Sequence, residues 1–373
     1  MASLDHRCVY ENDSSIALKL SLGDELGPLG RGATFPLVED PRHSDHSTIV
    51  GMFVLRPARV AWTASLMDGG APQSKPVSMF DAADWCFNVR GVDGGWLIAG
   101  GSPLDAYRLA LQYGLADAVI VGSNTVSKEG VEDGAQPGYL WQPYGPAAWP
   151  HLAAIDADLT AKIARLRRSW QQQGVLSARK YPAQIVVSQS GEHRPPANDV
   201  LAASVFKQRH PDGSPIETYV LTSEAGAARL RARAAAQGLG DRIDSILLPL
   251  SPPEQPEALD IARVPRLLRQ KLDIRLANHD GGQTVLSKFS AAGVLPQINL
   301  TLMRNRAVFD LLTSTDRIPT AELAGITNAF DTKRQLFWSG NHKLPTTLQV
   351  MSVLTDGDDG VVVSFDARGV RGL

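Results

Sequence analysis

The sequence predicts an α/β protein with a mostly parallel central sheet and helices on both of its faces. Short runs rich in β-branched residues alternate with helical stretches from residue 59 onward. Several of the strand-like runs, such as 117–122 and 245–250, are almost uniformly apolar, which is typical of strands buried on both faces. Because alternation of strands and helices implies crossover connections, we expect the strands to run parallel.

The expected elements follow in a regular order. A strand over 59–65 comes first, and a helix over 102–114 follows, because Ser102 and Pro103 suit a helix start and Gly114 a helix end. Further strands are expected at 117–122, 184–188, 217–222, 245–250, 273–277, 297–302, 348–355 and 360–367. Further helices are expected at about 157–173, 223–238, 262–272 and 283–293.

Composition changes along the chain and suggests where its parts begin. Residues 1–57 are rich in Gly, Pro and charge with little sustained periodicity, so we expect an N-terminal extension followed by one domain over 58–373. Residues 130–156 are rich in Gly, Pro and aromatic side chains, and such long loops are often functional.

Composition also excludes several classes of function. The chain has 37 Lys and Arg against 39 Asp and Glu, so it lacks the basic excess of a nucleic-acid-binding protein. Cys8 and Cys86 alone form neither a disulfide framework nor a multi-thiolate zinc site, and the histidines are scattered, so no metal is expected. No apolar run approaches the ~20 residues of a membrane span, and no signal peptide is visible, so a cytoplasmic location is expected.

One candidate site follows the apolar strand 117–122. Ligands of open α/β sheets bind beyond the carboxyl ends of the strands. Gly122 would let a ligand approach the backbone there, and Thr125 is placed to donate to a phosphate or a ribose. The same residues also suit an ordinary strand-to-helix turn.

Two Asp-Gly-Gly segments are further candidates. Asp280, Gly281 and Gly282 lie between an expected strand and helix, and the N–H groups at such a helix start can bind an anion. Asp68 precedes two glycines after the first expected strand, where its carboxylate would accept from a substrate or merely stabilise its own turn. A G-x-G-x-x-G fingerprint, a Walker A sequence and a G-x-S-x-G elbow are all missing.

Together and in order, TASLMDG, DAVIVGSNTV, YPAQIVVSQSG and ANHDGGQTVLSKFSAAGVLPQINLTL resemble the RibD C-terminal family, the reductase domain of riboflavin biosynthesis. The resemblance covers roughly residues 58–303, with a loop-rich insertion near 130–180. It implies a fold similar to dihydrofolate reductase, NADPH as cofactor and a homodimer. The deaminase that often accompanies this reductase needs His-x-Glu and Pro-Cys-x-x-Cys, so residues 1–57 are not a deaminase.

The resemblance also implies site residues. Asp280 replaces a glutamate that contacts substrate, and Asp68 and Asp280 are the carboxylates expected to act as general acid or substrate anchor. Tyr113 stands in place of an arginine that binds the substrate phosphate, and Trp96 approximates a family tryptophan on the substrate side. The residues expected at NADPH are Ala64, Gly122, Thr125, Glu129, Ser188, Ser190, Gly281, Gly282, Gln283, Thr284 and Val285.

The departures from the family pattern concentrate on the substrate side, which leaves several functions open. We expect a reductase of a ribosylaminopyrimidine-like pyrimidine or pteridine-type intermediate, in riboflavin synthesis or in a related pathway such as toxoflavin-type azapteridine synthesis. A non-catalytic protein that retains the fold and binds NADPH or another ligand is one alternative. Reduction of dihydrofolate or another imine is the other.

Overall fold

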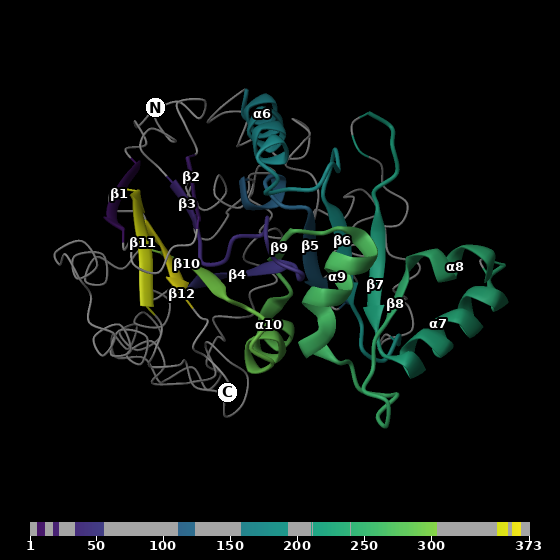
Figure 1. Ribbon diagram of the computed structural model, residues 1–373. Coiled ribbons are helices and arrows are strands. Elements are labelled where there is room, and N and C mark those ends of the chain that lie inside the picture. The colour runs from purple at the N-terminus through teal and green to yellow at the C-terminus, as the bar shows by residue number, and fades with distance from the viewer. Residues whose placement is uncertain are drawn as a thin grey trace, which may run out of the picture.

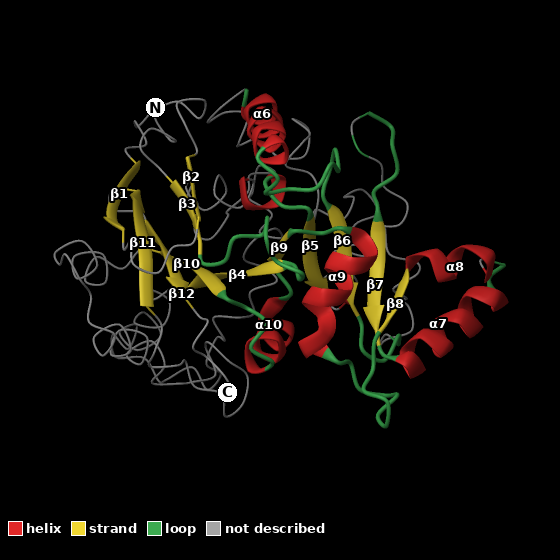
Figure 2. Ribbon diagram, viewed as in Figure 1, coloured by secondary structure: helices red, strands yellow, loops and turns green. Residues whose placement is uncertain are grey.

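The computed structural model describes residues 6–11, 18–21, 34–55, 111–123, 158–192, 210, 212–238, 240–303, 349–356 and 360–366. Strands and helices alternate through most of these ranges (Figures 1 and 2). The strands are β1 (His6–Glu11), β2 (Leu18–Ser21), β3 (Thr34–Leu37), β4 (Thr48–Leu55), β5 (Ala118–Gly122), β6 (Ala183–Val187), β7 (Thr218–Thr222), β8 (Leu247–Pro249), β9 (Leu276–His279), β10 (Gln297–Met303), β11 (Gln349–Asp356) and β12 (Gly360–Asp366). The helices are α6 (Leu159–Gln172), α7 (Glu224–Ala236), α8 (Gly240–Ile246), the 3₁₀ helix η8 (Ile261–Arg263), α9 (Val264–Leu272) and α10 (Gly282–Ala291).

The described strands form one large sheet and one small one. The large sheet has the order β1-β11-β12-β10-β4-β9-β5-β6-β7-β8, and β2 pairs with β3 separately. The seven strands from β10 to β8 run parallel to one another, whereas β12, β11 and β1 extend the β10 edge in antiparallel fashion. The predicted α/β class with a mostly parallel sheet is therefore confirmed.

The strand order creates a switch point beside β5. Strands β5, β6, β7 and β8 are added in one direction, and the chain then returns so that β9 lies between β4 and β5. Ligands of open parallel sheets bind where the strand order reverses, at the carboxyl ends of the strands. Those ends are Gly122 in β5 and His279 in β9.

The core lies on both faces of the middle strands. Every residue of β5 and β6 is buried, which requires cover on both sides of the sheet. Ser223 caps α7 by accepting a hydrogen bond from the Gly226 N–H, and α7 packs through buried residues such as Leu230. Figure 1 shows α9 in front of β5 and β6 and α10 below β4 in this view. Helix α6 contributes Trp170, whose ring centroid lies 5.4 Å from that of Phe35. Within the described ranges no helix has the length and apolar character needed to span a bilayer.

Most elements expected after residue 111 are confirmed, with two differences. The strand expected at 273–277 begins later, because Asp273 takes the left-handed conformation (φ 45°) that ends α9. Residues 240–246 form α8, so the strand expected at 245–250 is shortened to β8. In residues 1–57, where the sequence predicts no strand, the structure has β1, β2, β3 and β4, and β4 lies between β9 and β10 inside the parallel sheet.

Other expected elements lie outside the described residues. These are the strand at 59–65, the first part of the helix at 102–114, and the loop at 130–156; only Leu111–Gly114 of that helix is described, and it is helical. The expected boundary at residue 57 also lies there and stays a prediction. Strands β1 and β4, which precede it, pair within the same sheet as the strands that follow it.

Candidate functional site

The carboxyl ends of β5 and β9 bring two of the predicted motifs together. Ile120 pairs with His279 across the strands, and the Asp280 N–H donates to the Ile120 carbonyl oxygen at 2.8 Å. Just beyond these residues in both segments, a Cβ on Gly122 would lie 2.9 Å from the Gly281 carbonyl oxygen. Glycine at position 122 is therefore required by the close approach of the two backbones.

Gly281 has equally little room for a side chain. A Cβ there would lie 2.8 Å from His279 Cε1 and 2.9 Å from Val285 Cβ. Gly281 is also the residue before α10, and no side chain caps that helix start. The first N–H groups of α10 therefore lie beside two backbones that carry no side chain, an arrangement that suits a phosphate or diphosphate.

Asp280 is held by Tyr113, the residue expected to contact substrate. Tyr113 is fully buried, and its hydroxyl donates to Oδ2 of the half-buried Asp280. Burial raises the pKa of the Asp280 carboxyl above its ordinary value, although the hydrogen bond from Tyr113 opposes that rise. The structure thus brings Tyr113 and Asp280 into direct contact, and their roles toward a substrate stay predictions.

His279 lies directly beneath this turn and was not among the expected site residues. Its ring is completely buried, 4.6 Å from the ring of Phe289, and burial lowers its pKa to about 3. The Gly281 N–H approaches Nδ1 at 3.4 Å, so the neutral ring carries its proton on Nε2, which is buried and has no hydrogen-bond partner among the described residues. The sequence signal was a histidine directly before Asp-Gly-Gly at a strand end.

The loop after β6 lies against the same helix. Lys288 of α10 donates from Nζ to Gln189 Oε1 at 3.1 Å, which joins α10 to the segment between Ser188 and Ser190. Ser188 is buried, whereas Ser190 Oγ accepts from the Glu192 N–H at 3.1 Å. Two of the expected cofactor residues are therefore beside α10, at the carboxyl end of the neighbouring strand.

The remaining expected site residues are not placed by the structure. Ala64, Asp68, Trp96, Thr125 and Glu129 lie outside the described residues. Gly282, Gln283 and Thr284 form the first turn of α10, and only the backbone there is described; the side chain of Val285 packs against Gly122 and Gly281. Among the residues the structure does describe, no three His, Cys, Asp or Glu side chains group as metal ligands.

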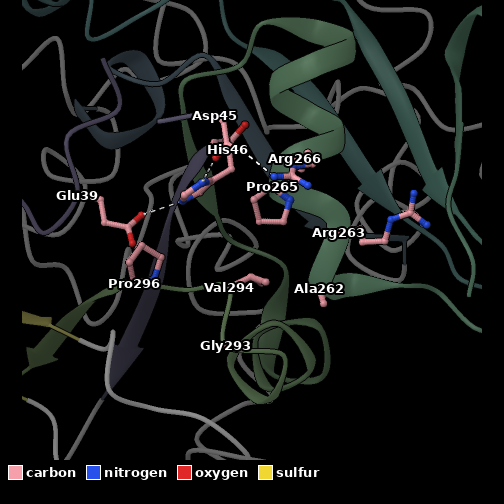
Figure 3. Close-up of a pocket in the computed structure, with 11 residues that line it drawn as sticks. Glu39, Asp45, His46, Ala262, Arg263, Pro265, Arg266, Gly293, Val294 and Pro296 are labelled. Atoms are coloured by element: carbon pink, nitrogen blue, oxygen red, sulfur yellow. Dashed lines mark hydrogen bonds and ion pairs between the residues drawn. The ribbon is translucent and has the colours of Figure 1, made fainter. Parts of the chain in front are cut away.

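A separate pocket opens at the amino ends of β4 and β10, away from Gly122 and Asp280 (Figure 3). His46 bridges two carboxylates there, with Nδ1 3.0 Å from Asp45 Oδ1 and Nε2 3.4 Å from Glu39 Oε2. Arg266 Nη2 lies 2.7 Å from Asp45 Oδ2, and His46 and Arg266 together hold the pKa of Asp45 at about 2. These charged groups satisfy one another across the pocket.

Comparison with known proteins gives distant structural similarities. No family model matches the chain, and no curated protein sequence does. A pyrimidine reductase-like protein from Corynebacterium diphtheriae aligns over 86% of this chain and 91% of its own, with 13% identity and a TM-score of 0.43. RibD from Acinetobacter baumannii aligns over 87% and 58%, with 11% identity and a TM-score of 0.41. The riboflavin biosynthesis reductase of Saccharomyces cerevisiae aligns over 87% and 91%, with 10% identity and a TM-score of 0.36.

Proposed function

We propose that this protein is an NADPH-dependent reductase of a small pyrimidine or pteridine-type substrate. The observation that carries the proposal is the contact between Gly122 and Gly281 at the switch point of the sheet, beside the uncapped start of α10. That contact joins the two segments that suit a diphosphate group. A carboxyl group, Asp280, lies at the same strand end.

The described residues fit a dinucleotide in three respects. Side chains are excluded at Gly122 and Gly281, and the first turn of α10 offers N–H groups. Nε2 of His279, buried beneath the turn, has no partner in the part of the chain that the structure describes. Gly122, Gly281 and the first turn of α10 would hold the diphosphate, and Ser188 and Ser190 would lie toward the adenosine. The cofactor would supply a hydride, while the protein orients it against the substrate.

The pathway and assembly belong to the same proposal. The substrate would be a ribosylaminopyrimidine-like intermediate of riboflavin synthesis or of a related azapteridine pathway. We propose a homodimer located in the cytoplasm and acting on a small molecule, without nucleic acid or membrane as partner. The assembly is tested by light scattering on the purified chain, which should report twice the 40.1 kDa of one chain.

The function is tested by binding and turnover together. The purified chain is titrated with NADPH and with NADH, and NADPH oxidation is then followed at saturating cofactor with ribosylaminopyrimidines, pteridines and dihydrofolate. Oxidation with a pyrimidine or pteridine supports the proposal, whereas turnover confined to dihydrofolate assigns the dihydrofolate alternative. NADPH binding without oxidation of any substrate assigns the non-catalytic alternative. Absence of NADPH binding overturns the proposal.

A further inference from the structure

Tyr113 and Asp280 are fixed relative to each other by more than their own hydrogen bond. Asp280 is anchored at its backbone, where its N–H donates to Ile120, and Tyr113 is fully buried. A second hydrogen bond joins the same two segments. Asn278, two residues before Asp280, donates from Nδ2 to the carbonyl oxygen of Gln112, the residue before Tyr113. The turn that carries Tyr113 is therefore attached to β9 at two points, which fixes the direction of the Asp280 carboxyl group.

The direction of the hydrogen bond distinguishes the two carboxyl oxygens. The tyrosine hydroxyl donates its proton to Oδ2, so Oδ2 acts as acceptor. As long as the tyrosine hydroxyl is the donor, a proton on Asp280 lies on Oδ1, the other carboxyl oxygen. Within the described part of the chain, no hydrogen bond or ion pair to Oδ1 is formed, and Asp280 is half-buried at the switch point of the sheet.

We propose that Tyr113 is a positioning residue that holds Oδ1 of a protonated Asp280 toward the substrate as the proton donor of the reduction. This inference rests on the proposed function and names the proton donor for it. As the hydride forms a C–H bond at the carbon of a substrate C=N or C=O group, the O–H bond of Asp280 breaks. An N–H or O–H bond forms on the substrate, the cofactor leaves oxidised, and the Asp280 carboxylate takes a new proton from water.

The surroundings favour the protonated form of this carboxyl group. Burial raises the pKa of Asp280, and the ionisable groups packed against it in the described ranges are Tyr113 and His279. His279 is neutral because burial lowers its pKa to about 3. Among the described residues no cation is placed to stabilise the Asp280 carboxylate, and the tyrosine hydroxyl does so only in part.

Infrared spectroscopy tests the inference without requiring turnover. In the full chain at neutral pH we expect a C=O stretch from a protonated carboxyl group that disappears in Asp280→Asn. In Tyr113→Phe the same band should persist and move to higher frequency, because Oδ2 loses its hydrogen bond. Tyr219→Phe is the matched control, since it removes a second tyrosine-to-carboxylate bond, from Tyr219 to Glu217 Oε1 at 2.5 Å on β7. The control should leave the Asp280 band in place.

Turnover gives a second measurement. General acids contribute roughly 100-fold or more, so Asp280→Asn should lower kcat by at least about that factor, and Tyr113→Phe by about 10-fold. The hydrogen bond from Tyr113 lowers the pKa of Asp280, so its loss should move the alkaline limb of the kcat profile to higher pH. A merely structural role for Tyr113 would reduce activity without moving that limb.

The failure of this inference differs from the failure of the proposed function. A neutral-pH spectrum without the band assigned to Asp280, or a band that Tyr113→Phe leaves unchanged, overturns the inference even if NADPH is oxidised. A chain that shows the expected bands but binds no NADPH overturns the proposed function. In that case the Asp280–Tyr113 arrangement stands, but its role as proton donor falls with the reaction.

Discussion

Gly122 and Gly281 pack backbone against backbone at the carboxyl ends of β5 and β9. The Gly281 carbonyl oxygen would lie 2.9 Å from a Cβ at position 122, and Val285 Cγ2 would lie 3.2 Å from it. Backbone atoms and the β-branched side chain of Val285 move less readily than a flexible side chain. A methyl group at position 122 must therefore displace the start of α10.

We expect Gly122→Ala to raise the dissociation constant of NADPH by at least ~10-fold, which corresponds to about 1.4 kcal/mol. The physical reason is that displacement of Gly281 moves the N–H groups that would face the diphosphate. Titration of the folded variant by calorimetry or cofactor fluorescence measures the change.

Gly240→Ala is the control for that substitution. A Cβ at position 240 would meet only Ala235 Cα, at an ordinary 3.9 Å, and Gly240 begins α8 rather than the site. Its NADPH affinity should equal that of the unmodified chain. Equal affinity in Gly122→Ala as well would show that the diphosphate does not lie at this contact.

Removal of the charge of Asp117 should lower the free energy of unfolding considerably. Its carboxylate is fully buried before β5 and accepts from Ser177 N–H and Oγ and from the N–H groups of Arg275 and Leu276. Asp117→Asn turns an amide NH₂ toward these donors, so we expect the free energy of unfolding to fall by about 2–4 kcal/mol. Denaturant titration measures this fall.

The matched comparison is Asp244→Asn. Asp244 pairs with Arg231 on the surface, 2.7 Å between Nε and Oδ1, with both side chains largely exposed. Exposed pairs contribute at most about 1 kcal/mol, so the unfolding midpoint should hardly move. A similar loss in both variants would mean that burial does not strengthen the role of Asp117.

The sequence predicts this fold where apolar runs are long and their ends are marked. β5 and β6 are short runs dominated by Ala, Val and Ile and buried throughout, and Ser223 begins α7 with a recognisable cap. β4 is also largely apolar, but it follows a stretch rich in Gly, Pro and charge, so composition places it in the N-terminal extension. Asp273 ends α9 in a left-handed conformation that a strand-like pattern does not reveal.

The site is less predictable because its contacts join distant parts of the chain. Each glycine motif could be identified alone, but the contact between Gly122 and Gly281 depends on the return of β9 to the place beside β5. Tyr113 and Asp280 are 167 residues apart, and nothing local indicates that one donates to the other. In the sequence His279 is one of several scattered histidines, and its burial becomes visible only in the assembled sheet.

A substitution in the pocket at the amino ends of β4 and β10 should not change NADPH affinity. Arg266 contacts Asp45 there, and neither residue lies at the carboxyl ends where we place the cofactor. Arg266→Gln should therefore leave the dissociation constant of NADPH unchanged in the titration used for Gly122→Ala. Weaker NADPH binding in this variant would indicate that the cofactor lies at the amino ends of β4 and β10, and it would contradict the proposed site.

The lowered pKa of His279 should make the stability of the folded chain depend on pH. Its pKa is about 3 in the folded chain against an ordinary 6.5, so below pH 6.5 the unfolded chain binds a proton that the folded chain does not. Stability is therefore lost as the pH falls from 6.5 toward 3, with a slope of up to about 1.4 kcal/mol per pH unit from this residue. Asp280 acts in the opposite direction, because its raised pKa favours the folded chain as the pH falls.

His279→Gln separates the two contributions, since it removes the imidazole and leaves Asp280 and Tyr113 in place. Denaturant unfolding across this pH range should give a variant that loses less stability on acidification than the unmodified chain. The difference between the two curves should be nearly constant above pH 6.5 and should shrink below it. Parallel curves through the whole range would mean that the imidazole takes up a proton in the folded chain. The conclusion that His279 is neutral beneath Gly281 would then be wrong.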